Sequence, residues 1–387
     1  MIKSTILTAL LFLGVYGANA QATFSVTATG TNPTIDSAIS YTTNIWSQYL
    51  TSSVPIKVNV VYTNMTGAGP LAVTFPNGEK DFAGAPKTGV WYATCLANSI
   101  AGIELNPGEF DMDIYVNSAV DYYFGTDGNP GVSQYDFVSI FLHEIAHGLG
   151  TASLSKIDAG IGSFGLLDSS STAPLVASFP FPQLNGLPSI WDSFLINGSG
   201  QLIADTLIFA NLTTALGSEF ESDDLFFSGP SATIVNGGSA PNIFAPTTYE
   251  AGSSLQHFDE ASFPNPSGNS LLTPYFFNGE VEHNPGDLLM GALTDIGWST
   301  VNVGVSEIDA ISVMAYPNPV ENMVRFKWNQ PYQGLTLIQL YNSTGKLVKS
   351  ISTPGSVEID MTEMAAGVYV YKAYLKSGVA SGILQKR

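Results

Sequence analysis

One short stretch of the chain, His143-Glu144-Ile-Ala-His147, has the residue types and spacing of a metal-dependent hydrolase site. On a helix, side chains four residues apart lie on one face, with Cβ atoms about 6 Å apart. Both imidazoles can therefore reach one zinc ion at about 2.0–2.1 Å. Glu144 can hold a water molecule beside that ion and accept its proton, because the ion lowers the pKa of the water toward about 7. The pattern predicts His143 and His147 as zinc ligands and Glu144 as general base.

The sequence also predicts the helix that must carry these residues, from Tyr135 to His147. Ser133 as N-cap, with Asp136 three residues later, forms a capping box. Gly148 and Gly150 follow the last apolar residues and are expected to end the helix.

Elements on either side of this helix should complete an α+β body. Apolar periodicity predicts two further helices and two strands, over 35–50, 287–296, 55–62 and 112–116 respectively. Residues 151–254 are rich in Gly, Ser, Pro and Asn. We expect an irregular insertion with some strands there, since several large apolar residues in it need burial: Trp191, Phe194, Leu195, Phe226 and Phe227. The apolar pattern of the body stops at Trp298.

A zinc site built on the helical pair needs a third ligand from elsewhere in the chain. The chain has four histidines, so His257 and His283 are the remaining imidazoles. Zinc accepts carboxylates as well as imidazoles, so Glu250 and Glu260 are alternatives. Spacing alone leaves the choice among these residues open.

The segment His143–Gly150, a long insertion, and Ser253-Ser-Leu-Gln-His257-Phe-Asp together resemble the leishmanolysin type of metzincin peptidase. Most metzincins have the pattern H-E-x-x-H-x-x-G-x-x-H, and here Ser153 occupies the position of the last histidine. In the leishmanolysin type, the third zinc histidine instead follows a domain-sized insertion. The resemblance, which covers residues 35–298 in element order, implies a zincin fold and His257 as the third ligand.

The same family has a Met-turn after the third histidine, commonly L-M-x-P. This chain has Leu271-Leu272-Thr-Pro274, with Leu272 where methionine is usual. The methionine packs beneath the site and does not bind zinc, and leucine has a similar volume. The resemblance implies a peptidase with His143, His147 and His257 as ligands and Glu144 as base.

Three other features have weaker signals. Tyr275 follows Pro274, and several metzincins use a tyrosine just past the Met-turn to stabilise the oxyanion; in a chain with 17 tyrosines a core or rim role is favoured. Asp127-Gly-Asn-Pro-Gly131 suggests a Ca²⁺ loop but lacks further alternating ligands, which favours a plain turn. Cys95, the one cysteine, has apolar neighbours and is expected to be a buried small hydrophobe rather than a thiolate ligand.

The charge of the chain excludes some classes of partner and divides the chain in two. Residues 21–302 carry 4 basic and 26 acidic side chains, a net −22, whereas residues 303–387 carry 8 and 6, a net +2. Nucleic acid and anionic membrane surfaces are poor partners for the first part, because both bind clustered cations.

Both ends of the chain read as export signals. Residues 1–20 have a basic start, an apolar run and Ala18-Asn-Ala20, which is typical of a cleaved signal peptide, and no later apolar run is long enough to span a membrane. Residues 311–387 show about seven short alternating strands, which predicts a small β-sandwich. Its sequence resembles the type IX secretion sorting domain of Bacteroidetes, in the segments Ala315–Val324, Asn342–Val348, Ala366–Val370 and Gln385-Lys-Arg387.

The expected fold is thus α+β, with a metzincin-like body over 21–298, a linker over 299–310 and an Ig-like sandwich over 311–387. The expected function is a secreted or surface-attached zinc endopeptidase that acts on proteins or peptides and is exported by the type IX machinery. An adhesin or glycan-binding protein with a structural metal is the alternative; Glu144 argues against it, because a structural site does not need that carboxylate. A zinc hydrolase of non-peptide amides or esters has the same ligands and stays open.

Overall fold

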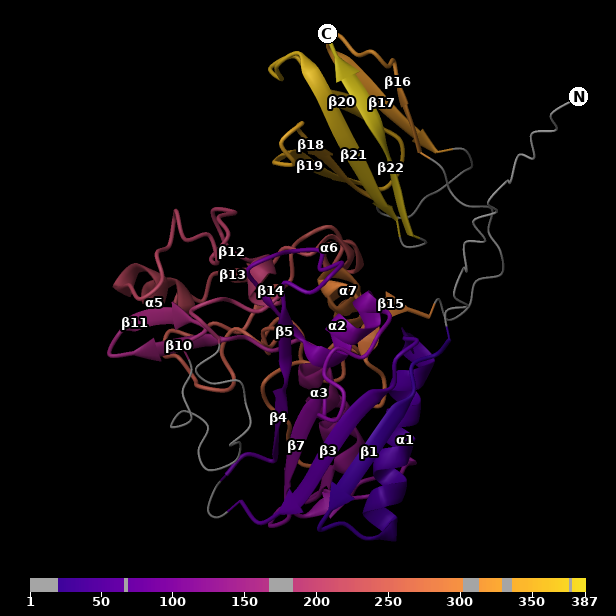
Figure 1. The fold of residues 1–387 in the computed structure, drawn as a ribbon, viewed down its shortest axis with the longest axis vertical. Coiled ribbons are helices and arrows are strands. Elements are labelled where there is room, and N and C mark those ends of the chain that lie inside the picture. The colour runs from indigo at the N-terminus through magenta and orange to yellow at the C-terminus, as the bar shows by residue number, and fades with distance from the viewer. Residues whose placement is uncertain (1–19, 66–68, 167–183, 302–312, 329–335, 376–377) are drawn as a thin grey trace, which may run out of the picture.

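The computed structural model describes residues 20–65, 69–166, 184–301, 313–328, 336–375 and 378–387 (Figure 1). Two large hydrophobic cores lie in these residues, one between Ala22 and Trp298 and one between Val313 and Leu384, and Trp91, Leu154 and Leu184 form a third, small cluster. The expected signal peptide, apart from Ala20, and residues 302–310 of the expected linker lie outside the described residues.

A four-stranded sheet is the centre of the first body. The strand order is β1 (Phe24–Thr29), β3 (Ile56–Thr63), β7 (Met112–Asn117) and β4 (Ala72–Pro76). The first three strands are parallel, and β4 runs antiparallel to β7 at the edge. The alternating apolar residues of β3 are buried, as its sequence pattern predicts.

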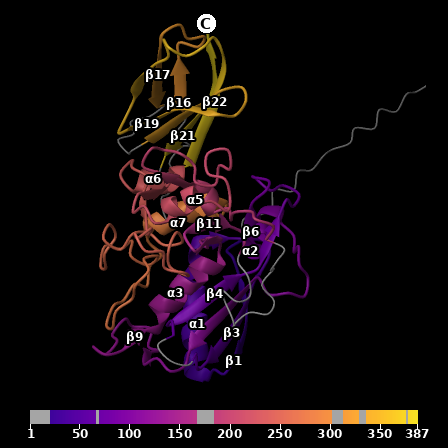
Figure 2. The ribbon, with the colours of Figure 1, turned by 90° about the vertical axis from the view of Figure 1, so that its left-hand side faces the viewer.

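Two helices, α1 (Pro33–Tyr49) and α3 (Phe137–Gly148), contact each other and pack on the sheet (Figure 2). Asn32 caps α1 by accepting hydrogen bonds from two backbone N–H groups, and Pro33 at the first position has the φ that a helix requires. Trp46 of α1 is fully buried and donates its indole N–H to the Leu142 carbonyl of α3 at 3.2 Å. This contact holds the middle of α3 against α1.

The expected start of α3 is wrong by two residues. Asp136, not Ser133, is the N-cap, and it accepts the backbone N–H of Ser139 at 2.8 Å. Tyr135 and Asp136 form the short strand β9, which pairs with β8 (Tyr122–Tyr123). Asp136 also accepts a hydrogen bond from His283, a distant residue that no local capping pattern includes.

The segment after α3 is folded into the first core. Trp191, Leu195 and Phe227 are fully buried there, whereas Phe194 and Phe226 are half-buried. The sequence predicts strands in this segment, but not the two short α-helices that its described residues form. Its described elements are β10 (Ser155–Asp158), β11 (Ile161–Phe164), η1 (Asp192–Phe194), β12 (Leu195–Asn197), α5 (Thr214–Phe220), β13 (Leu225–Phe227), α6 (Pro230–Val235) and β14 (Asn242–Ile243).

The first two residues of the expected linker over 299–310 belong to the first body instead. Ser299 and Thr300 form β15, which pairs with β2 (Leu50–Thr51), so the body extends past Trp298. The expected helix before it is α7 (Gly286–Ile296). The remaining elements of the body are α2 (Thr94–Ala101), β5 (Gly78–Lys80) and β6 (Trp91–Ala93).

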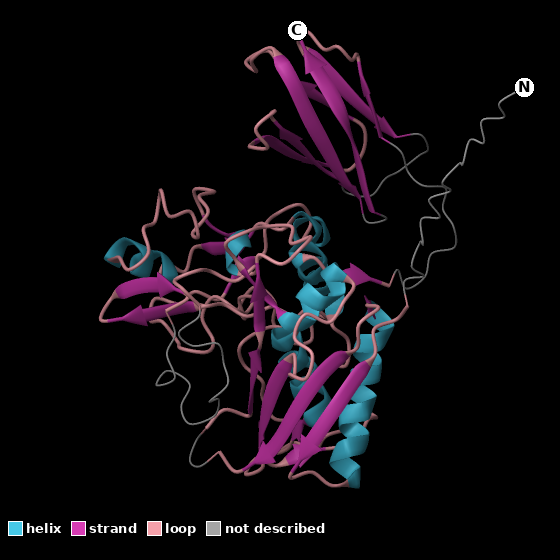
Figure 3. Cartoon of the chain, in the orientation of Figure 1, coloured by secondary structure: helices cyan, strands magenta, loops and turns pink. Residues whose placement is uncertain are grey.

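The C-terminal part is all β (Figure 3). In the residues described there, seven strands form one sheet in the order β16-β17-β20 and another in the order β19-β18-β21-β22. None of the described helices combines the length and apolarity that a bilayer crossing requires. The strands are β16 (Val313–Tyr316), β17 (Met323–Trp328), β18 (Thr336–Tyr341), β19 (Leu347–Thr353), β20 (Val357–Asp360), β21 (Gly367–Leu375) and β22 (Gly378–Lys386).

Candidate metal centre

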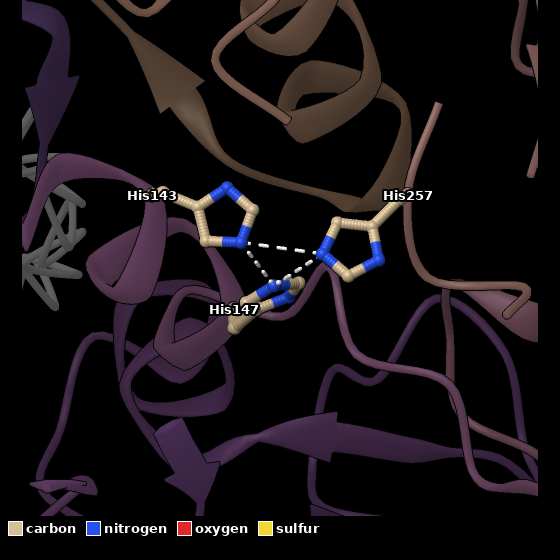
Figure 4. Close-up of side chains that lie close together, drawn as sticks. All are labelled: His143, His147 and His257. Carbon is tan, nitrogen blue, oxygen red and sulfur yellow. Dashed lines mark hydrogen bonds between the residues drawn. The ribbon is translucent and has the colours of Figure 1, made fainter. Parts of the chain in front are cut away.

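Three histidines from two distant segments meet beside α3 (Figure 4). The Nε2 atoms of His143 and His147 are 3.0 Å apart, and that of His257 lies 3.1 Å from His147 and 3.2 Å from His143. All three side chains are buried, at 7%, 6% and 3% exposed. In the described part of the chain, this is the one group of three or more His, Cys, Asp or Glu residues placed to hold a metal ion.

Each imidazole is oriented through its other nitrogen by a backbone carbonyl. The Nδ1 of His143 faces the Leu271 oxygen at 2.7 Å, that of His147 the Thr151 oxygen at 3.2 Å, and that of His257 the Ser253 oxygen at 2.6 Å, in each case within hydrogen-bond distance. A carbonyl only accepts hydrogen bonds, so each Nδ1 carries the proton. In a neutral ring the proton-free nitrogen is then Nε2.

Burial keeps these rings neutral. It lowers the pKa of His143 to about 4 and, with the nearby His143 ring, that of His257 to about 3. Burial and the two neighbouring rings lower the pKa of His147 well below its usual value. Three neutral rings with protonated Nδ1 atoms have no proton to share among their Nε2 atoms, so the short N–N distances are not hydrogen bonds.

The nitrogen triangle fits a zinc ion. Two zinc–nitrogen bonds of about 2.0–2.1 Å at a tetrahedral angle separate their nitrogens by about 3.3 Å. The observed 3.0–3.2 Å is close to that separation. Three imidazole nitrogens are also a donor set found in catalytic zinc sites, where water or substrate takes the fourth position.

The chain after α3 turns back to reach His147. Gly150 has φ +116°, a conformation that side-chain-bearing residues rarely adopt, and a Cβ there would lie 3.2 Å from Ile296. This turn brings the Thr151 carbonyl within reach of the His147 ring. The turn therefore explains why the motif has glycine at position 150.

Glu144 lies on α3 next to His143 and is 6% exposed. Its Oε2 accepts a hydrogen bond from the Thr74 hydroxyl on β4 at 2.7 Å. Burial raises the pKa of Glu144 to about 7, and the Thr74 hydrogen bond opposes that rise. The side chain is thus oriented toward the edge strand of the sheet and is not a member of the histidine cluster.

A turn over Ser270–Thr273 supports two of the histidines, in the place where the sequence suggested a Met-turn. The Thr273 N–H donates to the Ser270 carbonyl at 3.0 Å and closes the turn. The Leu271 carbonyl faces His143, and the Leu272 carbonyl accepts from the N–H of Phe258, next to His257. Leu271 and Leu272 are fully buried.

The alternative third ligands lie elsewhere. His283 donates from Nε2 to Asp136 at 2.7 Å, so it is a partner of the helix cap. Glu250 accepts the Tyr275 hydroxyl at 2.9 Å, and Glu260 is not in the cluster. The Tyr275 hydroxyl thus binds a carboxylate, and the side chain is 39% exposed.

Two other residues from the sequence lie away from the histidines. Cys95 is 2% exposed, and its thiol donates to the Gly148 carbonyl at 3.3 Å. Burial raises the pKa of this thiol well above its usual value, which suits a buried hydrophobe and not a thiolate ligand. Asp127 accepts the Tyr123 hydroxyl at 2.5 Å and is in no group of metal-binding geometry among the described residues.

Comparison with known families identifies the C-terminal part. Residues 314–382 match the family model described as the secretion system C-terminal sorting domain. They form a sorting domain. This domain shows that the protein is exported by the type IX secretion system of Bacteroidetes, which releases its cargo or attaches it at the outer surface. No curated protein sequence matches the chain.

Solved structures are similar to this chain over about a fifth of its length. One is a DUF3244-family protein with an immunoglobulin-like β-sandwich from Bacteroides vulgatus, 16% identical, covering 22% of this chain and 93% of its own, with a TM-score of 0.19. Another is dimeric latent PorU from Porphyromonas gingivalis, 24% identical, covering 22% of this chain and 10% of its own, with a TM-score of 0.18.

Proposed function

We propose that this protein is a secreted zinc-dependent endopeptidase with a metzincin-like body. The observation that carries the proposal is the arrangement of His143, His147 and His257, whose proton-free Nε2 atoms lie 3.0–3.2 Å apart while each Nδ1 faces a backbone carbonyl. Such carbonyl partners fix the ring orientation and tautomer of metal-binding histidines.

The histidines would hold the zinc ion, and Glu144 would move the proton. A zinc ion in such a site lowers the pKa of a coordinated water toward about 7 and polarises the carbonyl under attack. Glu144 accepts the proton of the attacking water on a carboxylate oxygen and then delivers it to the leaving amine nitrogen. Thr74 orients the base in this step, because its hydroxyl donates a hydrogen bond to Glu144 Oε2.

The edge strand β4 supports a polypeptide as the substrate. Among the described strands, β4 has a neighbour on one side only, β7. An extended peptide can add to the outer edge of such a strand through backbone hydrogen bonds. Because Thr74 lies on β4 and contacts Glu144, a peptide bound along this edge would pass the catalytic carboxylate. A non-peptide ester or amide gains nothing from a strand edge.

The test is Glu144→Gln, measured for bound zinc and for hydrolysis of casein. Glutamine keeps the size of the side chain but is no base, so we expect one zinc per chain and a rate lower by on the order of 10²–10⁴. Glu109→Gln is the matched control. Glu109 is exposed and lies 35 residues before Glu144, so this variant should retain the wild-type rate. Unchanged hydrolysis in Glu144→Gln, or a wild-type protein that binds no zinc, would contradict the proposal.

A further inference from the structure

A chain of buried hydrogen bonds links the Ser270–Thr273 turn to the start of α3. The Ser270 hydroxyl donates to Glu282 Oε2 at 3.2 Å, and the backbone N–H of Glu282 donates to Ser139 Oγ at 2.7 Å. Ser139 Oγ donates in turn to Asp136 Oδ1, also at 2.7 Å. All four residues are buried, at 3%, 8%, 0% and 2% exposed.

The two ends of this chain flank one of the histidines. Ser139 lies one helical turn before His143 on α3, and Ser270 precedes Leu271, whose carbonyl faces the His143 Nδ1. The chain and the Leu271–His143 hydrogen bond therefore form a closed ring of contacts. Through this ring, the position of the Glu282 carboxylate sets how closely the Leu271 carbonyl approaches the imidazole.

A carboxylate at this buried position carries a cost in free energy. Burying one is unfavourable unless its oxygens accept hydrogen bonds, and an apolar side chain of similar size would pack without that requirement. Glu282 accepts from the Ser270 hydroxyl and from the backbone N–H of Asn284. The directional contact to Ser270 is what an apolar residue would not supply.

We propose that Glu282 is a positioning residue of the metal centre, which acts through Ser270 and the Leu271 carbonyl to orient the His143 ring. The inference rests on the proposed zinc site and adds to it a residue outside the ligand set. Partners of this kind, one step beyond the ligands, typically alter metal affinity by 10–100-fold when they are removed.

The experiment is a zinc titration of the full secreted chain against a chromophoric chelator. Wild type, Ser270→Ala, Glu282→Met and the double variant are compared, with Glu280→Met as the matched control. Each single substitution should weaken zinc binding on the order of 10-fold, and the double variant should bind no more weakly than Glu282→Met, because both changes remove the same hydrogen bond from Ser270 to Glu282. Glu280 accepts the Phe277 N–H and takes no part in the chain of hydrogen bonds from Ser270 to Asp136, so its variant should bind zinc as tightly as wild type does.

Thermal unfolding of the metal-free proteins separates positioning from mere stabilisation. Lower unfolding temperatures with an unchanged zinc Kd in both single variants would overturn the proposal, as would additive losses of affinity in the double variant. A wild-type chain that binds no zinc would overturn the proposed function as well. If Glu282→Met does not fold, Ser270→Ala decides alone, with the imidazole N–H signal of His143 in the ¹H NMR spectrum expected to exchange faster than in wild type.

Discussion

The hydrogen bond from Thr74 to Glu144 can be removed with almost no change in side-chain shape. Thr74→Val replaces the hydroxyl by a methyl group, and both residues favour a strand such as β4. A hydrogen bond to a charged group contributes about 1.5–3 kcal/mol. Since about 1.4 kcal/mol corresponds to a factor of ten, the loss would lower kcat/KM by roughly 10- to 150-fold. Thr74 is half-buried, so water can partly replace the hydroxyl, and we expect about 10-fold.

Peptide hydrolysis and zinc content are measured together for this variant. Thr74→Ser keeps the hydroxyl and is the matched control, with kcat/KM expected within about twofold of wild type, as for substitutions of less than 0.5 kcal/mol. Zinc content should stay at one per chain in both variants, because Thr74 is not a ligand. A wild-type kcat/KM in Thr74→Val would refute the assigned role of this contact, and loss of zinc would show that Thr74 supports the metal instead of the base.

Three further outcomes are expected. His257→Ala should weaken zinc binding by roughly 10²–10³-fold, since four-ligand sites bind with about 10–16 kcal/mol, or roughly 3–4 per ligand; His283→Ala should still bind one zinc in the same titration. Burial raises the pKa of Asp295 to about 7, above the usual 3.8, so its contribution to stability is full below about pH 4 and is lost as the pH rises through 7. The stability of wild type relative to Asp295→Asn should therefore fall by as much as about 4 kcal/mol between pH 4 and 8, and parallel urea-unfolding profiles would contradict this. A chain ending at Val301 should fold and bind zinc without the sorting domain, whereas one ending at Trp298 should unfold at a lower temperature because it lacks the β15–β2 pairing.

The sequence predicted the parts of the site that depend on local geometry. The helical period alone places His143 and His147 on one face, and the apolar flanks of the motif predict that the helix is buried. The strands β3 and β7 and the sandwich follow from alternation of apolar residues. His257 lies 110 residues from His147, so no local rule connects them, and the expectation came from resemblance to a family.

The groups that orient the site could not be predicted in the same way. The partners of the three Nδ1 atoms are backbone carbonyls, of Leu271, Thr151 and Ser253, and a carbonyl has no signature in the sequence. Thr74 is one of many threonines in strands, and its role appears when β4 is placed beside α3. The predicted N-cap of α3, Ser133, is wrong: Asp136 accepts the Ser139 N–H, and its tertiary partner His283 has no local signature in the sequence.

The arrangement of the histidines argues for a cation even before any activity is measured. A buried cluster held only for stability would gain most by alternating donors and acceptors, since a buried acceptor without a donor is unfavourable. Here all three protons are directed outward to carbonyls, and the three remaining lone pairs face one another at 3.0–3.2 Å. This arrangement destabilises the metal-free protein, and a cation bound at the three Nε2 atoms would offset that cost. Zinc should therefore raise the free energy of unfolding by about 4 kcal/mol at a thousand times its Kd, a gain that no hydrogen-bonded histidine cluster would show.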